Sequence, residues 1–413
     1  MPLGRDLLLL GALLCLGGCN APLMGPRHMG TEVMTFGASP PPRPAPAGRT
    51  VALLAPLTGA DADLGPALVN AAKLGLGTGT VPPLAVYDTG STPAGAALAA
   101  RQAVAGGVGL ILGPLRAEEA SAVAPVATAA HVDVLAFTSN SLVSRPGLWP
   151  LGITPMQQVA ALVHAARADN HGRIAGLLPL TPLGQAMERG LKAMKPSAPI
   201  ELYTDFASMN VAARVISGYA HRRGVIDTEI KQLEAEHTVA AQQKVVRLLR
   251  RPIPPPSFNA LLVAETGTGL DELGTLLAYY DISPSSVQIL GPALWAATPG
   301  SVAAAGFTGA LYTAPDPAAA AQFVNRYALV FGAAPPPLAD LAFDAGDIAR
   351  LATQAGGLDQ SVLTNPAGFA GADGVLALEP DGTVRRGLAI YRIGAAGAQI
   401  VQPAPAALPA PVF

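Results

Sequence analysis

The chain has 413 residues, half of them apolar and only 13% charged, so it is long enough for two or three compact units with substantial cores. Its 26 basic and 28 acidic side chains give a formal net charge of −2. This balance offers no broad basic surface to a phosphate backbone, which excludes nucleic acid as a general partner. The composition also excludes extensive disorder away from the chain ends.

The first twenty residues predict export. Arg5 precedes an apolar run, Leu7 to Leu16, that is too short to span a bilayer of about 30 Å but suits the core of a secretion signal. The segment 16–19 then resembles a bacterial lipobox, and this resemblance implies that residues 1–18 are removed and that Cys19 carries lipid. Asn20 implies the outer membrane by the sorting rule of enteric bacteria. The alternative is a cleaved signal or an anchor with an incidental cysteine.

Residues 19–49 are rich in Pro, Gly and Ala, which predicts an extended tether. From residue 51 onward, apolar runs alternate with helical segments, as in a doubly wound α/β lobe. The first lobe is expected to open with the stretch 51–59, a buried strand that ends in a turn, and its further strands include 84–87, 108–112 and 132–137.

The same alternation resumes after residue 152 and predicts a second lobe. Its expected strands include 174–178, 260–264, 287–290 and 388–393, and helices are expected at 318–331 and 338–355. Asp381-Gly382 between apolar runs predicts a hairpin turn.

The expected division of the chain follows from these elements. We assign residues 50–152 and 295–386 to lobe 1, and residues 153–294 and 387–395 to lobe 2. Residues 396–413 are expected to form a loose tail.

One segment of the second lobe, residues 222–251, is unusually charged, with seven basic and four acidic side chains. Lys244, Arg247, Arg250 and Arg251 gather towards its end, where cations complement a helix dipole. Two interpretations stay open. The segment is either a solvated helix that covers the lobe or a surface that contacts another protein, and in the second case these four cations are the candidate contact residues.

Polar side chains follow the strand expected at 132–137. Thr138, Ser139 and Asn140 stand at its carboxyl end, where open α/β sheets bind ligands in a crevice. The sequence therefore predicts a ligand cleft at these three residues.

The order of the motifs resembles the type I periplasmic binding proteins, the leucine/isoleucine/valine-binding class. The motifs that carry the resemblance lie at 51–59, 87–89, 112–115, 123–125, 136–140, 152–155, 343–344 and 371–393. The resemblance implies two three-layer α/β lobes joined by three crossing strands, expected near Gly152, Leu294 and Gly387, which close on a ligand by hinge motion.

In amino-acid binders of this class, hydroxyl and backbone N–H groups after the third strand and at the next strand end hold the ligand. Thr138 to Asn140 match the second group, but Ala117, Glu118 and Glu119 stand where serines are expected, and two acids there repel a carboxylate unless they are paired. Glu265, at a strand end of the second lobe, is the candidate partner for an ammonium group.

Segments 258–264, 276–281 and 287–295, together with the charged segment, resemble the lipoprotein activators of penicillin-binding proteins. This resemblance implies a non-catalytic lipoprotein on the periplasmic face of a membrane that contacts a peptidoglycan synthase. The alternative is the solute receptor of an amino-acid-type importer, with a small molecule in the cleft. In either case the membrane is reached only through the Cys19 lipid.

We expect neither a cofactor nor a metal. Gly267-Thr268-Gly269 follows a strand as a dinucleotide loop does, but Glu272 stands where the third glycine is required. The six histidines show no paired ligand spacing.

Overall fold

The structure, a computed structural model, describes residues 50–79 and 81–408. The expected signal segment, the tether and the lipidation site at Cys19 lie outside these residues. Within the described part of the chain, no helix is both long enough and apolar enough to span a bilayer.

Lobe 1 is built on a five-stranded parallel sheet in the order β2-β1-β3-β4-β5. The strands are β1 (Val51–Ala55), β2 (Leu84–Asp88), β3 (Leu110–Leu112), β4 (Asp133–Ala136) and β5 (Leu148–Pro150). All five residues of β1 are buried, because helices cover both faces of a parallel sheet. Helices α1 (Gly65–Leu76), α2 (Pro93–Ala105) and α3 (Ala117–Ala130) connect the first four strands.

A second chain segment completes lobe 1. Its helices are α11 (Pro317–Phe331), α12 (Ala339–Ala355) and α13 (Gln360–Leu363), and its strands β11 (Phe369–Gly371), β12 (Gly374–Leu378) and β13 (Val384–Arg386) form a small antiparallel sheet. The turn between β12 and β13 contains Asp381-Gly382, so the predicted hairpin is confirmed.

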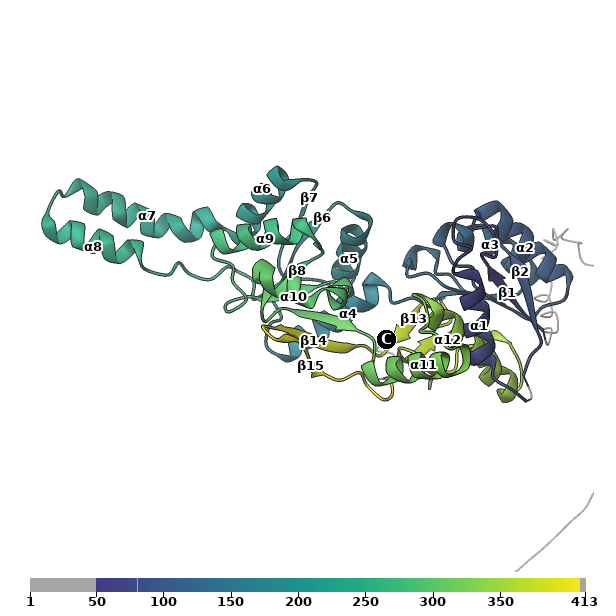
Figure 1. Cartoon of the computed structure of the whole chain (residues 1–413). Helices are drawn as coiled ribbons and strands as arrows, with labels where there is room; N and C mark the ends of the chain where they lie inside the picture. Colours follow the sequence, from purple (N-terminus) through teal and green to yellow (C-terminus); the bar gives the residue numbers. More distant parts are fainter. Residues whose placement is uncertain (1–49, 80, 409–413) are drawn as a thin grey trace, which may run out of the picture. The chain divides into compact units, whose positions relative to one another are not determined.

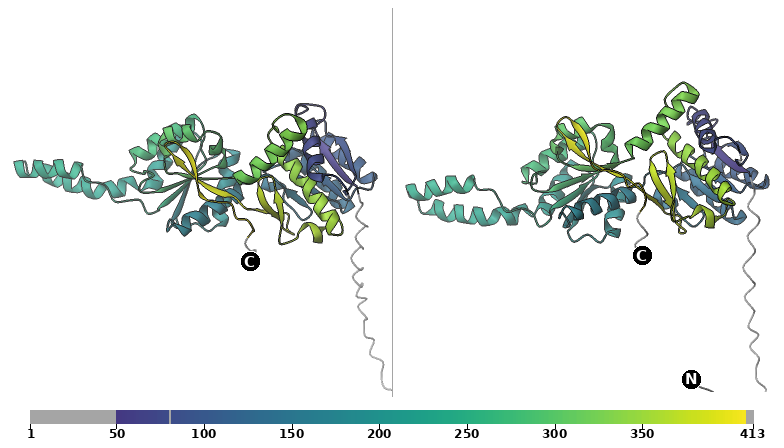
Figure 2. Two further views of the ribbon diagram at one scale, coloured as in Figure 1. Left: turned by 60° about the horizontal axis from the view of Figure 1, so that its bottom comes forward. Right: turned by 90° about the horizontal axis from the view of Figure 1, so that it is seen from below.

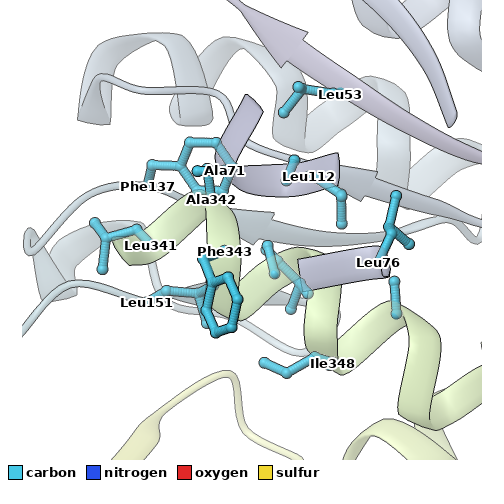
Figure 3. Packing of buried hydrophobic residues seen from close by; sticks show 14 of the residues in the cluster. Leu53, Ala71, Leu76, Leu112, Phe137, Leu151, Leu341, Ala342, Phe343 and Ile348 are labelled. Carbon is cyan, nitrogen blue, oxygen red and sulfur yellow. The ribbon is translucent and has the colours of Figure 1, made fainter. Parts of the chain in front are cut away.

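Helix α12 packs on α1 at the centre of this lobe (Figure 3). A Cβ atom on Gly75 would lie 2.1 Å from the carbonyl oxygen of Phe343, and one on Gly346 would lie 2.3 Å from that of Ala72. The two helix backbones therefore approach each other at positions where only glycine fits. Leu53, Phe137 and other apolar side chains of the sheet pack beside this crossing.

Lobe 2 is built on a seven-stranded mixed sheet in the order β15-β14-β10-β9-β8-β6-β7 (Figure 1). Its strands are β6 (Ile174–Pro179), β7 (Ile200–Tyr203), β8 (Ala260–Val263), β9 (Gln288–Gly291), β10 (Leu311–Ala314), β14 (Ala389–Gly394) and β15 (Gly397–Gln402). The first five are parallel, whereas β14 and β15 run antiparallel to their neighbours. The helices of this lobe are α4 (Pro155–Ala168), α5 (Pro182–Ala193), α6 (Phe206–Ser217), α9 (Thr268–Tyr279) and α10 (Pro299–Val302).

Two expected boundaries differ from the structure. Residues 295–314, which we assigned to lobe 1, belong to lobe 2, because β10 pairs with β9 and because Trp295, Phe307 and Tyr312 pack in the core of lobe 2. The middle crossing therefore follows Ala314 rather than Leu294. The expected loose tail is also wrong in part, because residues 397–402 form β15 and extend the sheet.

The charged segment forms two antiparallel helices, α7 (Tyr219–Ala235) and α8 (Val239–Leu249), that we call the helical hairpin (Figure 2). Its apolar side chains form a core of their own, made of Ile226, Ile230, Leu233, Ala241 and Leu248. The interpretation as one helix that covers the lobe is therefore wrong. The reversal lies at residues 236–238, where His237 takes a positive φ of 50° and the hydroxyl of Thr238 caps α8 by accepting from the N–H of Ala241.

Candidate functional site

The carboxyl ends of β1 and β2 are joined by the side chain of Asp88. Its carboxylate accepts hydrogen bonds from the backbone N–H groups of Leu57 (2.9 Å), Thr58 (3.1 Å) and Gly90 (2.9 Å), and from the hydroxyl of Thr58 (2.6 Å). Burial opposes ionisation of Asp88, but these donors outweigh it and lower the pKa of the carboxyl group. The donors at these two strand ends are therefore used by the protein itself.

At the carboxyl end of β3, too, a carboxylate of the protein itself uses the hydrogen-bond donors. The buried side chain of Glu119, in the first turn of α3, accepts a hydrogen bond from the backbone N–H of Arg116 at 3.3 Å and lies 3.4 Å from the hydroxyl of Thr89. Burial raises the pKa of Glu119, while its hydrogen bonds act in the opposite direction. The positive end of this helix thus faces a carboxylate that belongs to the chain.

An ion pair lies beside this carboxylate. Arg116 donates through two nitrogens to the carboxylate of Asp61, at 2.5 and 2.6 Å. The hydrogen bond from Arg116 lowers the pKa of Asp61. Glu118, the second acid of the helix start, is exposed. The two acids that the sequence placed near the expected carboxylate site therefore differ in role, because Glu119 is buried and bonded whereas Glu118 faces solvent.

Two of the three predicted cleft residues at the end of β4 line a pocket. Ser139 and Asn140 border a cavity of about 390 Å³, together with residues at the start of α4 and α5. Thr138 is not part of its lining, and its hydroxyl accepts from the backbone N–H of Asn140 at 3.2 Å. The pocket is completed by Ser141, Leu142, Pro155, Pro182, Leu183, Gln185, Ala186 and Arg189.

Arg189 is the charged group of this pocket, and the sequence reasoning did not include it. A signal was present, since Pro182, Gln185, Ala186 and Arg189 recur at the spacing of one helix face. A pocket with hydroxyl, amide and guanidinium groups favours neutral or anionic polar ligands.

Glu265 lies outside this pocket. Its carboxylate accepts a hydrogen bond from the hydroxyl of Tyr203 at 2.8 Å, and its backbone carbonyl accepts one from the indole N–H of Trp295 at 2.9 Å. Burial and the neighbouring carboxylate raise the pKa of Tyr203. The structure therefore gives Glu265 a partner within lobe 2 and does not bring it together with Ser139 and Asn140.

The four cations proposed for protein contact lie on one exposed side of α8 and just beyond its end. Lys244, Arg247 and Arg251 recur at helical spacing, and Arg250 directly follows the last residue of the helix. Lys244 pairs with Glu229 of α7 at 3.4 Å. The three arginines have no ion pair with any described residue.

Comparison with known proteins agrees with this architecture. Residues 49–212 match the model of the periplasmic binding protein family. A putative branched-chain amino acid ABC transporter protein from Rhodospirillum rubrum superposes with a TM-score of 0.60, at 18% identity, over 85% of this chain and 99% of that one.

The chain has the type I periplasmic binding protein fold.

Proteins with a regulatory role share the fold. The C-domain of LpoA from Haemophilus influenzae, described as a regulator of PBP1A, superposes with a TM-score of 0.58 at 18% identity, over 85% of this chain and 99% of that domain. Full-length LpoA of the same organism gives a TM-score of 0.58 at 19% identity, and the chain spans 59% of its length. No curated protein sequence matches the chain significantly. The expected resemblance to type I binding proteins is confirmed, and these likenesses, all below 20% identity, establish the fold alone.

A buried charged cluster lies within lobe 1. The guanidinium of Arg386 donates to the carbonyl oxygen of Leu151 at 2.6 Å and lies 3.6 Å from Asp344 and 3.8 Å from Asp373. Burial, opposed by Arg386, raises the pKa of Asp344 to about 7, and burial and Asp373 raise that of Asp340 to about 8. The carboxyl groups of Asp340, Asp344 and Asp373 thus share a single positive charge, that of Arg386. This favours a protonated carboxyl group at neutral pH.

Another carboxyl group with a raised pKa lies in a pocket of lobe 1. This pocket, of about 580 Å³, is lined by Asp133, His131 and Asp359, among others. Burial, with a smaller contribution from Asp359, raises the pKa of Asp133 to about 7. Among the residues that the structure describes, neither this pocket nor the cluster around Arg386 forms a group that could hold a metal ion.

Proposed function

We propose that the protein is a non-catalytic, periplasm-facing lipoprotein that regulates peptidoglycan synthesis by contacting a peptidoglycan synthase of the penicillin-binding protein class. The observation that carries this proposal is the buried carboxylate of Glu119. It uses the N–H of Arg116 and lies beside the hydroxyl of Thr89, donors of the kind that hold a ligand carboxylate in amino-acid binders of this fold. A free amino acid would have to displace a buried group of the same charge.

The helical hairpin supports a role in protein contact. It has a core of its own and presents Arg247, Arg250 and Arg251 to solvent without a carboxylate partner among the described residues. Arginine is enriched at the centres of protein interfaces, where its planar guanidinium binds carboxylates with two hydrogen bonds. We therefore propose that Lys244 and these three arginines contact an acidic surface of the synthase. The fold shared with the LpoA C-domain is consistent with this proposal.

Anchoring of the protein is part of the same proposal. We infer from the lipobox-like segment that Cys19 carries the lipid that attaches the protein to a membrane, and from Asn20 that this membrane is the outer one. Incorporation of radiolabelled palmitate into the wild-type chain, and its loss in Cys19→Ala, would test the lipid. Fractionation of membranes on a sucrose gradient would test the location.

The proposed contact is tested by binding of the full chain, in detergent, to purified bifunctional synthases. We expect wild type to bind one of them and to change its polymerisation rate. The triple variant Arg247→Glu, Arg250→Glu, Arg251→Glu is expected to bind at least about tenfold more weakly, because each reversal places like charges together. The matched control reverses three exposed cations away from the hairpin, Arg101, Lys195 and Arg392, and should bind as wild type does. If no synthase binds, the proposed function is wrong.

A second candidate function is the solute receptor of an amino-acid-type importer. It is favoured by one observation, the pocket of about 390 Å³ that Ser139 and Asn140 line. This candidate predicts a thermal shift with one free amino acid, equivalent to about 2.7 kcal/mol at one hundred times the dissociation constant. Such a shift, lost in Asn140→Ala and retained in the triple hairpin variant, would establish the importer role and displace the regulatory one.

A further inference from the structure

A side of the helical hairpin is apolar and faces solvent. On α8, Val239, Val246 and Leu249 recur at intervals of seven and three residues, which places them on one helix face, and their side chains are 72%, 50% and 55% exposed. A groove of about 460 Å³ runs beside this face and is lined by Leu233, Glu234, His237, Gln242, Val245 and Val246. We call Val239, Val246, Leu249 and this groove the groove face.

The small core of the helical hairpin does not account for a second apolar face on α8. Only five side chains form its core, and two-helix units ordinarily gain stability from a third or fourth helix. The apolar side chains of α8 therefore face two directions, one towards α7 and one towards solvent. The second direction lacks a partner within the described chain.

The charges of the hairpin are separated along its length. Two of its acids, Glu234 and Glu236, lie at the tip and the other two, Asp227 and Glu229, lie near the middle of α7, whereas five arginines lie at its base, at residues 222–223 and 247–251. Glu234 borders the tip end of the groove. Arg250 is not part of the groove lining, but it follows Val246 by one helical turn and so lies on the base side of the groove.

We propose that the groove face binds the groove face of a second copy of this chain, with the two hairpins antiparallel. A two-fold axis then places the acidic tip of each hairpin against the basic base of the other, so that Glu234 meets Arg250 of the second copy twice. The apolar side chains of both α8 helices pack between these charged ends as in a four-helix bundle. One chain carries both complementary ends, which favours a second copy over an unrelated helix that would match only the base.

The surface is short, so the dimer is a weak one that depends on protein concentration. Sedimentation of the full chain in detergent should show a monomer–dimer equilibrium. Glu234→Arg and Arg250→Glu are each expected to raise the dimer dissociation constant about tenfold, since each creates two like-charge contacts. The control Lys231→Glu changes an exposed charge of α7 outside the groove and should leave the equilibrium unchanged.

Mixing the two variants provides the decisive test. With Glu234→Arg, positions 234 and 250 both carry arginine, and with Arg250→Glu both carry glutamate. In a heterodimer of the two variants each contact again pairs an arginine with a glutamate, so the mixture should associate at the wild-type affinity. In cells, the single substitution Val246→Cys near the middle of the face should give a disulfide-linked dimer of the full chain, and Lys231→Cys should not. Neither substitution touches the core of the hairpin.

Three results would overturn the proposal. These are a monomer at every concentration, a dimer that neither charge reversal weakens, and a cross-link from Val246→Cys to a different protein. Glu234→Arg leaves Lys244, Arg247, Arg250 and Arg251 intact, so loss of the dimer with synthase binding retained would separate this surface from the proposed synthase contact.

Discussion

The side chain of Glu119 accepts a hydrogen bond from the backbone N–H of Arg116, three residues before it, at the buried start of α3. This contact is the half of a capping box in which an acid at the third helical position binds the N–H of the cap residue. We propose that it also uses an N–H group that would otherwise be available to a ligand, so it bears on the proposed function as well as on helix stability.

The first prediction concerns this contact. Replacement of Glu119 by Ser removes the buried charge and frees the N–H of Arg116, so the variant should acquire measurable affinity for L-leucine or glycine by isothermal titration calorimetry, whereas wild type should give no heat. Glu118→Ser is the matched control, because Glu118 is exposed and should not change binding. Equal binding by wild type and Glu119→Ser would show that the carboxylate does not block the site.

The second prediction concerns pH. The folded-state pKa values of Asp344 and Asp340 are raised to about 7 and about 8, above the value of about 3.9 for an unfolded aspartate. Their protonated forms therefore stabilise the fold fully below about pH 4, and this contribution is lost as the pH rises through 7 and 8.

The melting temperature should accordingly fall between pH 6 and pH 9. The side chain introduced by Asp340→Asn is neutral at every pH, so this variant should show a smaller fall in melting temperature near pH 8. Asp347, Asp373 and Arg386 remain as its charged neighbours. Part of the slope should persist, because Asp133 titrates near pH 7 in another pocket. A flat profile in wild type would contradict the assignment of raised pKa values.

The third prediction concerns Arg386. Its replacement by Met removes the only cation of the described residues that pairs within 4 Å with Asp344 and Asp373, and it should lower the free energy of unfolding by about 3–5 kcal/mol, because buried charge is left without compensation. Arg392→Met, at an exposed position of β14, is the matched control and should cost less than about 0.5 kcal/mol. Urea denaturation measures both. Recovery of stability in the double variant Arg386→Met, Asp344→Asn would identify the uncompensated charge as the cause.

The fourth prediction concerns the crossing of α1 and α12. Gly75→Ala and Gly346→Ala each place a Cβ atom against a backbone carbonyl of the other helix and should destabilise lobe 1 by at least about 1–3 kcal/mol. Gly224→Ala, in α7 with no atom within 4 Å of the added Cβ, should instead stabilise its helix by about 0.5–1 kcal/mol. Thermal unfolding of the three variants, compared with wild type, decides whether the close approach of the helices or helix propensity dominates.

The strand and helix order could be read from the sequence because a covered parallel sheet requires unbroken apolar runs, as in Val51 to Ala55. The crossing after Ala314 was missed, since an apolar strand such as β10 reads alike in either lobe and only its pairing with β9 assigns it. The turn of the helical hairpin was indicated in the sequence by Thr238, an N-cap residue in the middle of the charged segment.

The candidate site was predicted less completely than the fold. The sequence indicated only that the acids at 118 and 119 would repel a ligand carboxylate unless they were paired. The partner of Glu119, a backbone N–H, carries no side-chain signal in the sequence. Glu265 was expected to face a ligand, and the contact with Tyr203 depends on the adjacency of β8, β6 and β7, which no local pattern encodes.

The glycine-mediated contact between α1 and α12 also constrains how the protein folds. The two helices are far apart in the chain, and the part of lobe 2 that runs from α4 to β10 is inserted between them. The core of lobe 1 therefore stays open until α12 has been synthesised and has packed on α1. Long-range closure of this kind is slow. The exposed apolar face of α1 during that interval is where a chaperone would bind and where misfolding would begin.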